Sequence, residues 1–220
     1  MQVLVIGDSG GIGRALADHA RARGDTVTGV SRSREGLDVT DRASVARVLG
    51  RLSGPFDVVL VATGALEIDG RGPEKSLRAL DPEAMVAQFR LNAVGPALVL
   101  SEVRRLLPRD RRAVFAALSA RVGSIGDNRA GGWYGYRSAK AALNQLIRTA
   151  SIELARTHPQ LACVCLHPGT VRSALTQRYL GRHPAVEPAQ AAANLWRVID
   201  TITPAETGSF LDWAGKRVAW

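Results

Sequence analysis

The stretch QVLVIGDSGGIGRALADHARARG, residues 2–24, combines an apolar segment, a glycine-rich turn and a helical segment in that order. The apolar run over 2–6 ends at Gly7, as is typical of a buried parallel strand. The glycines at 7, 10, 11 and 13 let the backbone turn tightly and approach a ligand. The following helix begins with unpaired N–H groups and a positive dipole end, which favour a pyrophosphate. This order therefore predicts a nucleotide-binding unit at the N-terminus.

A second strand is predicted over 26–31, and the residues at its end should meet the ribose of an adenosine group. A site for NAD has an acid there, which accepts a hydrogen bond from the 2′-hydroxyl. Here Ser31, Arg32 and Ser33 stand in this place, and the nearest acid is Glu35. Arginine and serine suit a 2′-phosphate, because they offer a positive charge and hydrogen-bond donors. We therefore predict that the chain prefers NADPH.

The rest of the chain alternates predicted strands and helices. Few residues separate the second strand from the third, which is expected at 36–39, too few for a normal crossover helix. We therefore expect a shortened connection between the second and third strands, which leaves the adenine side more open. Further strands are predicted over 56–62, 113–118, 160–166 and 208–213, the last at an edge, and helices over 41–52, 81–107, 134–158 and 188–202.

The predicted helix over 134–158 carries Tyr136 and Lys140 near its start, four residues apart. That spacing places both side chains on one face of the helix. An ammonium beside a phenol favours the phenolate, so it lowers the tyrosine pKa from about 10. Such a tyrosine can give a proton to a carbonyl oxygen or take one from an alcohol. Tyr134 lacks this pairing, because Ser138 stands four residues after it. Alone, the pair is more often an ordinary helix start with a solvated lysine.

Asn92 lies near the middle of the long helix predicted over 81–107. An asparagine in that place is usually a tolerated surface residue. The alternative is a kink, whose freed carbonyl would hold a water beside the Lys140 ammonium. A proton could then pass from the lysine to solvent.

Composition argues against several other classes of protein. The net charge of +9 comes mostly from arginine, spread along the chain without interleaved aromatic residues. This pattern indicates a solvated surface with some attraction for an anionic ligand, so we expect no nucleic-acid partner. No apolar run approaches the ~20 residues of a membrane span, and we expect neither a signal peptide nor a membrane partner. Cys163 and Cys165 are expected to be buried free thiols, with no metal site, which fits the cytoplasm.

Five motifs together resemble the short-chain dehydrogenases/reductases, in their order and over essentially the whole chain. They are Gly7-x3-Gly11-Ile12-Gly13, Asn92, a serine after the fifth strand, Tyr136-x3-Lys140 and His167-Pro168-Gly169-Thr170. The phrase SARVGSIGDNRAGGWYGYRSAKAALNQL, residues 119–146, resembles the compact, C-factor-like and sniffer-like carbonyl reductase branch. The resemblance implies a Rossmann-type, doubly wound parallel sheet in a single domain, residues 1–220, with its ligand crevice at the carboxyl ends of the strands.

The resemblance also implies a role for each matching position. Tyr136 would be the acid/base, Lys140 would lower its pKa and hold ribose hydroxyls, and Asn92 would relay a proton. Asp38 and Val39 would lie against the adenine. The implied cofactor contacts are Gly7, Ser9, Gly10, Gly11, Ile12, Gly13, Ser31, Arg32, Ser33, Asp38, Val39, Gly64, Tyr136, Lys140, Pro168, Gly169, Val171 and Ser173.

Two departures from the family pattern concern the site. The family's Asn-Asn-Ala-Gly after the fourth strand is replaced by Val-Ala-Thr-Gly over 61–64. The catalytic serine is displaced, since Gly123 stands at its usual spacing before Tyr136. The hydroxyl that holds the substrate carbonyl must then come from Ser119 or Ser124, and we favour Ser124, which this branch also keeps. The alternative is that either serine merely caps a turn.

Several residues are expected on the substrate side. A loop over 172–187 should cover the substrate, and Trp133, Tyr134 and Tyr179 could line an apolar pocket, although aromatic residues are more often core. His167 is expected to pack at a strand end rather than act as a base.

The expected function is NADPH-dependent reduction of an aldehyde or ketone to an alcohol, or the reverse reaction. The alternative is a non-catalytic regulatory or signalling protein that binds a nucleotide on the same fold. The resemblance also implies a homodimer or homotetramer formed through the helices at 83–107 and 134–158.

Overall fold

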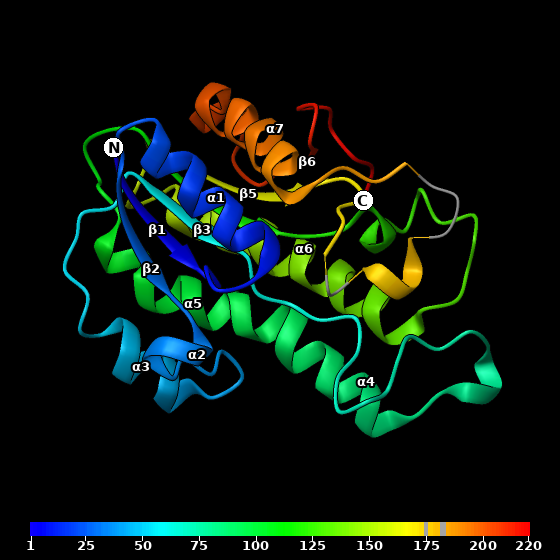
Figure 1. The fold of residues 1–220 in the computed structure, drawn as a ribbon. Helices are drawn as coiled ribbons and strands as arrows, with labels where there is room; N and C mark the ends of the chain where they lie inside the picture. The colour runs from blue at the N-terminus through cyan, green and yellow to red at the C-terminus, as the bar shows by residue number, and fades with distance from the viewer. Residues whose placement is uncertain (174–175, 181–183) are drawn as a thin grey trace.

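The structure, a computed structural model, describes residues 1–173, 176–180 and 184–220. Its centre is a six-stranded sheet with the strand order β2-β1-β3-β4-β5-β6, and every neighbouring pair is parallel (Figure 1). The strands are β1 (Gln2–Ile6), β2 (Thr26–Val30), β3 (Val58–Val61), β4 (Ala113–Leu118), β5 (Leu161–His167) and β6 (Phe210–Asp212).

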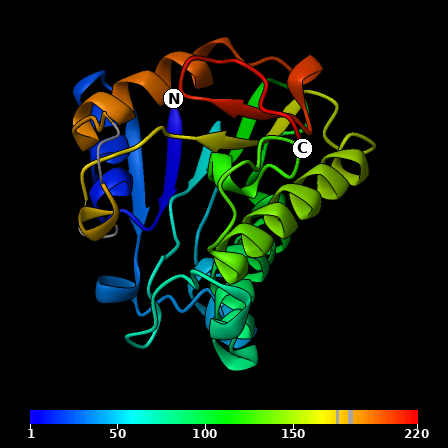
Figure 2. The same ribbon diagram turned by 90° about the vertical axis from the view of Figure 1, so that its right-hand side faces the viewer.

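Helices cover both faces of this sheet. On one face lie α1 (Gly11–Ala22) and α7 (Pro188–Thr201), and on the other α3 (Arg42–Leu49), α5 (Gly95–Val103) and α6 (Tyr134–Leu154) (Figure 2). Short turns of helix are η1 (Leu77–Ala79), η4 (Arg121–Gly123), η5 (Gln177–Tyr179) and η6 (Pro204–Glu206). The α/β fold with a doubly wound parallel sheet, expected from the sequence, is thereby confirmed.

The uninterrupted apolar sequences of the central strands follow from burial on both faces. In β1, Leu4 and Ile6 face the core under α3, α5 and α6, whereas Val3 and Val5 face the core under α1 and α7. In β3, Val59 likewise faces the core under α3, α5 and α6, whereas its neighbours Val58 and Leu60 face the core under α1 and α7. Two separate apolar cores thus hold the helices against one sheet.

The connection from β2 to β3 is short at its start. A single turn of helix, α2 (Arg32–Glu35), follows β2 directly, and residues 36–41 then lead to α3. Asp41 caps α3, as its carboxylate accepts hydrogen bonds from the backbone N–H groups of Ala43 and Ser44. The third strand expected at 36–39 is wrong: in the described part of the chain these residues pair with no strand, so β2 forms the edge of the sheet on this side.

The long helix predicted over 81–107 is interrupted. It consists of α4 (Pro82–Phe89), a π turn η2 (Arg90–Val94), α5 and a 3₁₀ turn η3 (Arg104–Leu106). By length and composition the stretch Pro82–Leu106 could cross a membrane, but it packs along α6 as a core helix does. The π turn contains Asn92, which is buried, so this residue interrupts the regular α-helix rather than lying on its surface.

The carboxyl edge of the sheet gathers segments that are distant in sequence. The chain leaves β1 toward β2 on one side and β3 toward β4 on the other, so the strand order reverses between β1 and β3. Ligands of such sheets bind at this topological switch point. The glycine turn after β1, the segment after β3 and the first turn of α6 all contribute residues to one cavity there.

Candidate active site

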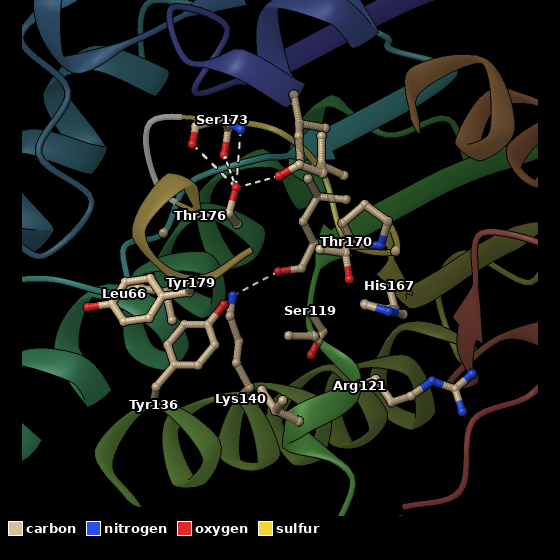
Figure 3. Close-up of a pocket in the computed structure, with 18 of the residues that line it drawn as sticks. Leu66, Ser119, Arg121, Tyr136, Lys140, His167, Thr170, Ser173, Thr176 and Tyr179 are labelled. Atoms are coloured by element: carbon tan, nitrogen blue, oxygen red, sulfur yellow. Dashed lines mark hydrogen bonds between the residues drawn. The ribbon is translucent and has the colours of Figure 1, made fainter. Parts of the chain in front are cut away.

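A cavity of about 1030 Å³ opens at this edge of the sheet (Figure 3). Its wall is built from the glycine turn, the segments that follow β3, β4 and β5, and the start of α6. These parts contribute residues 10–13, 62–64, 118–122 and 167–171, together with Trp133, Tyr136 and Lys140. The cavity therefore joins part of the glycine turn with Ser119, Tyr136 and Lys140 in one space. The described lining does not include Asn92, Ser124 or the predicted adenosine contacts at 31–33, 38 and 39.

The glycine turn fits the pyrophosphate of a dinucleotide. Gly7 has a φ of 89°, a conformation that side chains with a Cβ rarely adopt. A Cβ on Gly13 would lie 2.2 Å from the Gly7 carbonyl oxygen, so only glycine lets α1 approach the turn this closely. Gly10, at the start of α1, contributes no side-chain cap. The first N–H groups of α1 can therefore point at phosphate oxygens.

Tyr136 and Lys140 both face the cavity from α6, as Figure 3 shows. The two residues are 8% and 3% exposed, and desolvation is the main influence on the pKa of both. Burial raises the pKa of Tyr136, and burial lowers the pKa of Lys140 to about 8. The Lys140 ammonium donates to the carbonyl oxygen of Leu118 at 2.9 Å and lies 5.8 Å from the Tyr136 ring centroid.

The pKa of Tyr136 is therefore raised, whereas the sequence predicted that Lys140 would lower it. The residues are close, as the helical spacing predicted, but burial dominates the effect of the neighbouring ammonium on Tyr136. A phenol with a raised pKa keeps its proton at neutral pH.

Asn92 is fully buried in the π turn and joined to the segment that follows β3. Its amide oxygen accepts from the backbone N–H of Ala65 at 3.2 Å, and its amide nitrogen donates to the Ala65 carbonyl at 2.9 Å. The amide nitrogen also donates to the side chain of Gln88 at 2.7 Å. Asn92 thus holds the backbone next to Gly64, at the floor of the cavity.

The two candidate serines lie in different surroundings. Ser119 lines the cavity, and its hydroxyl donates to the side-chain oxygen of Asn144 at 2.7 Å. Ser124 is 1% exposed, and its hydroxyl accepts from the backbone N–H of Asp127 at 3.1 Å. Within the lining formed by the described residues Ser124 is absent. The structure thus brings Ser119, rather than the favoured Ser124, to the cavity that holds Tyr136.

The segment after β5 closes one side of the cavity. Pro168, Gly169 and Val171 line it, and Gly169 has a φ of 81°. A Cβ on Gly169 would lie 3.1 Å from the indole of Trp213. Ser173, also in the lining, shares a 3.1 Å hydroxyl contact with Thr176.

The predicted covering loop over 172–187 is described in part. Residues 174, 175 and 181–183 lie outside the described residues. Tyr179 lines the cavity and meets the ring of Trp133 edge to face, with 5.4 Å between ring centroids. Of the three aromatic residues expected at an apolar pocket, these two are in the lining, whereas Tyr134 is not among the described lining residues.

Charged groups surround the predicted adenosine end. The N–H and hydroxyl groups of buried Ser31 donate to the carboxylate of Glu35 at 2.7 and 3.2 Å. The guanidinium of Arg34 pairs with both carboxylate oxygens of Asp8, inside the glycine turn. Arg32 is exposed beyond the end of β2. Hence Arg34 neutralises the acid nearest the turn, and Arg32 stays accessible to a ligand.

The other residues predicted to contact the cofactor on this side are exposed, except Val39, which is buried beside α5. Ser9 is exposed in the glycine turn, and Ser33 lies in α2 with its hydroxyl 3.5 Å from that of Ser31. Asp38 accepts two hydrogen bonds from Thr40, which lower the pKa of its carboxyl. Val39 is buried against Gly95 of α5.

His167 and the two thiols are buried groups near the cavity. His167 lines it at the end of β5, and its Nδ1 has no hydrogen-bond partner among the described residues. Burial lowers the pKa of His167 to about 4, so the ring is neutral at ordinary pH. Cys163 and Cys165 are free and buried in β5, as expected, and burial raises the pKa of Cys163 to about 12.

Sequence reasoning missed three residues that support the site. Gln88 lies one helical turn before Asn92 and donates to the Leu66 carbonyl at 2.9 Å. The i, i+4 spacing of two amide side chains could have indicated this pair. Glu67 and Glu74, in the segment over 65–80 between β3 and α4, carried no such pattern. They contact Tyr179 and Gly135, each across a long stretch of sequence.

Comparisons with known proteins agree with this geometry. A family model described as enoyl-(acyl carrier protein) reductase matches residues 6–213. The 1-hydroxy-2-glutathionyl-2-methyl-3-butene dehydrogenase of Rhodococcus sp. strain AD45 is 32% identical over 234 residues, with 99% of both chains covered. The C-signal protein of Myxococcus xanthus is 34% identical over 170 residues, covering 76% of this chain and 95% of its own.

A solved structure supports the same assignment. It is described as a short-chain dehydrogenase/reductase from Burkholderia multivorans with bound NADP, and it is 26% identical to this chain. The alignment has a TM-score of 0.81 and covers 100% of this chain and 99% of that chain.

Proposed function

This chain belongs to the short-chain dehydrogenase/reductase family, and from that premise we propose that it interconverts a carbonyl compound and an alcohol with NADPH. Membership of this family makes it an oxidoreductase. The observation that carries the proposal is the shared cavity, in which the phenol of Tyr136 and the glycine turn face the same space.

The reaction divides between cofactor and protein. NADPH, when bound, supplies the reducing equivalent to the carbonyl carbon. Tyr136 then provides the proton for the carbonyl oxygen, and its raised pKa keeps that proton in place at neutral pH. The hydroxyl of Ser119, at the same cavity wall, would orient the carbonyl oxygen. Lys140, behind the tyrosine on α6, would hold the ribose of the cofactor and pass a proton toward Asn92.

The preference for NADPH is supported by the charges at the end of β2. A 2′-phosphate needs a cation, and the guanidinium of exposed Arg32, just after β2, would offer one. Asp8 would repel a phosphate, but its charge is paired with Arg34. The NADP bound in the Burkholderia multivorans relative supports the same cofactor.

The substrate class is suggested by the remaining cavity wall. Leu66, Trp133 and Tyr179 supply apolar surface, while Arg129 and Arg137 supply positive charge. In the described part of the chain these two arginines donate to backbone carbonyl oxygens rather than to carboxylates. The Rhodococcus relative is named for a glutathionyl alcohol, which carries carboxylates. We therefore include carboxylate-bearing carbonyl compounds and alcohols among the candidate substrates.

The test follows NADPH absorbance with the purified chain over a panel of aldehydes and ketones. The panel pairs neutral members with carboxylate-bearing ones, and the reverse reaction is run with NADP⁺ and the matching alcohols. Turnover of at least one pair that depends on Tyr136 is expected. Tight NADPH binding without turnover of any member would reject the reductase proposal.

The alternative, a non-catalytic signalling role, rests on one structural observation. The Ser119 hydroxyl already donates to Asn144, so it must change partner before it can donate to a substrate. The Myxococcus xanthus relative bears the name C-signal. The same panel separates the two roles, since a signalling protein would bind NADPH and leave its absorbance unchanged.

Self-association through the long helices is part of the same proposal. Exposed apolar side chains on these helices are Val86, Val94, Leu146 and Ile152. They lie within the ranges 83–107 and 134–158 predicted to form a homodimer or homotetramer. Light scattering on the purified chain should give the mass of two or four chains, and a monomer would reject the interface. We also propose a cytoplasmic location, which the buried free thiols favour and cell fractionation would test.

A further inference from the structure

The segment over 65–80 crosses the first turn of α6. Within it, the carboxylate of Glu74 accepts a hydrogen bond from the backbone N–H of Gly135 at 3.0 Å. The Glu74 carbonyl oxygen accepts a second one from the N–H of Trp133. Glu74 is 8% exposed, so its carboxylate is fixed inside the protein against the start of this helix.

This carboxylate replaces the cap that α6 lacks. The residue before the helix, Trp133, has a φ of 55° and makes no side-chain cap hydrogen bond. Gly135 is the second residue of α6, whose N–H an N-cap side chain would normally satisfy. In the described part of the chain, no basic side chain forms an ion pair with Glu74. Its carboxylate therefore lies at the N-terminal end of α6, where the helix dipole is positive.

The absence of a side chain at Gly135 makes room for the Glu74 carboxylate. A Cβ at this position would lie 2.8 Å from one carboxylate oxygen of Glu74 and 3.5 Å from the other. The carboxylate thus occupies the place that a side chain would need. The next residue along the helix is Tyr136.

The geometry points to Glu74 as a positioning residue, which fixes the first turn of α6 and so holds the phenol of Tyr136 at the cavity. This inference rests on the proposed reductase function, in which Tyr136 provides the proton. Trp133, whose backbone N–H donates to the Glu74 carbonyl, packs its ring edge to face on Tyr136 with 6.3 Å between centroids. Both groups that orient the tyrosine from its N-terminal side therefore depend on Glu74.

The same segment is anchored at its other end to the opposite wall of the site. Ala65 is bonded to Asn92, and the Leu66 carbonyl accepts from Gln88. Between these anchors and Glu74, Glu67 accepts a hydrogen bond from the hydroxyl of Tyr179 at 2.7 Å. Segment 65–80 therefore spans from the proton-relay position to the catalytic helix.

The test compares Glu74→Ala, which removes the acceptor, with Glu74→Gln, whose amide oxygen can still accept from Gly135. Glu206→Ala is the matched control, because its carboxylate also accepts from a backbone N–H, that of Thr203, beyond α7. Each variant is measured for kcat, KM and NADPH affinity on a substrate that the parent turns over. Hydrogen exchange of the Gly135 amide is measured on the same samples.

For Glu74→Ala we expect kcat to fall by about tenfold or more, because a small displacement of a catalytic group is costly. NADPH affinity should stay within about twofold, and Gly135 exchange should accelerate by about tenfold for the loss of one buried hydrogen bond. Glu74→Gln should recover most of the kcat and of the exchange protection. Glu206→Ala should leave both at parent values.

Parent kcat in Glu74→Ala, or a Glu74→Gln variant no better than Glu74→Ala, would overturn the positioning role. So would an equal kcat loss in Glu206→Ala, which would indicate general destabilisation. If the parent turns over no substrate, the proposed function fails, and the exchange rates then decide the capping contact alone. Unchanged exchange at Gly135 in Glu74→Ala would overturn that contact whatever the activity.

Discussion

The side-chain oxygen of Asn92 and the ammonium of Lys140 converge on one point above Gly64. A Cβ built on this glycine would lie 2.7 Å from the Asn92 oxygen and 3.6 Å from the lysine nitrogen. Asn92 belongs to a π turn and Lys140 to α6, and the two elements pack against each other. Gly64 is therefore the position at which the proposed proton route can be blocked without removing either of its members.

Gly64→Ala should impair both activity and stability. The new methyl group would collide with Asn92, and the φ of 151° at this position disfavours side chains with a Cβ. We expect a loss of about 1–3 kcal/mol in the free energy of unfolding and a kcat lowered by about tenfold or more. Gly24→Ala is the control, because Gly24 also has a positive φ, 86°, but nothing lies within 4 Å of its Cβ site. Equal kcat values in the two variants would contradict the proton route.

Tyr136→Phe should separate binding from chemistry. The phenol lines the cavity, and its removal leaves the ring and its packing in place. Turnover should fall by about 10²- to 10⁴-fold, the usual contribution of a general acid, while NADPH affinity stays within about twofold. Tyr134→Phe serves as the control, because Tyr134 has no lysine four residues later. Retained turnover in Tyr136→Phe would remove the tyrosine from the mechanism.

The two serines should respond differently to replacement by alanine. Ser119→Ala should lower kcat/KM by about tenfold or more, because a hydroxyl at the cavity wall would be lost. Ser124→Ala should mainly cost about 1 kcal/mol of stability, through the lost contact with the Asp127 amide. Steady-state kinetics and urea unfolding on both variants check this assignment. A larger kinetic loss in Ser124→Ala would restore the sequence-based preference.

Arg32→Ala should weaken NADPH binding selectively. Loss of one charged contact to a phosphate corresponds to about a tenfold or larger rise in Kd. The Kd for NADH, which lacks the 2′-phosphate, should stay within about twofold. Fluorescence titration with both cofactors gives the two values for parent and variant. Equal weakening of both cofactors would show that Arg32 does not read the 2′-phosphate.

Lys140 should make stability depend on pH in the alkaline range. Burial places its pKa near 8 in the folded chain, below the ordinary value of 10.5. Between these values the unfolded chain binds more protons, so the contribution of Lys140 to stability rises with pH. This contribution is complete above about 10.5 and is lost as pH falls toward 8. In urea unfolding, the free energy of unfolding of the parent minus that of Lys140→Met should rise with pH. A difference that does not change with pH would contradict a lowered pKa for buried Lys140.

Many of the strands and helices could be predicted from local patterns in the sequence. The strand at 2–6 and the helix that begins at Tyr134 lie where apolar periodicity and turn residues placed them. The break in the helix over 81–107 could be stated only as an alternative, because a π turn is decided by what the helix packs against. Here that partner is α6, with the buried amide of Asn92 facing the segment after β3.

Fewer features of the candidate active site could be predicted from the sequence. The spacing of Tyr136 and Lys140 is a property of one helix, so sequence indicated it directly. Which serine reaches the cavity depends on the course of the loop between β4 and α6, where no periodicity constrains the chain. Glu74 and Gly135 lie 61 residues apart, and no pattern in either segment indicates their contact.

By itself, the sequence determined the glycine turn and the tyrosine–lysine pair, because each follows from interactions between residues near one another in the chain. The doubly wound sheet pairs strands that are distant in sequence, and it was predicted from the resemblance to a known family. Tertiary structure decided the protonation behaviour of Tyr136 and Lys140, the choice of Ser119 and the cap that Glu74 places on α6. These depend on desolvation and on contacts between distant segments, and both arise only when the two faces of the sheet are covered.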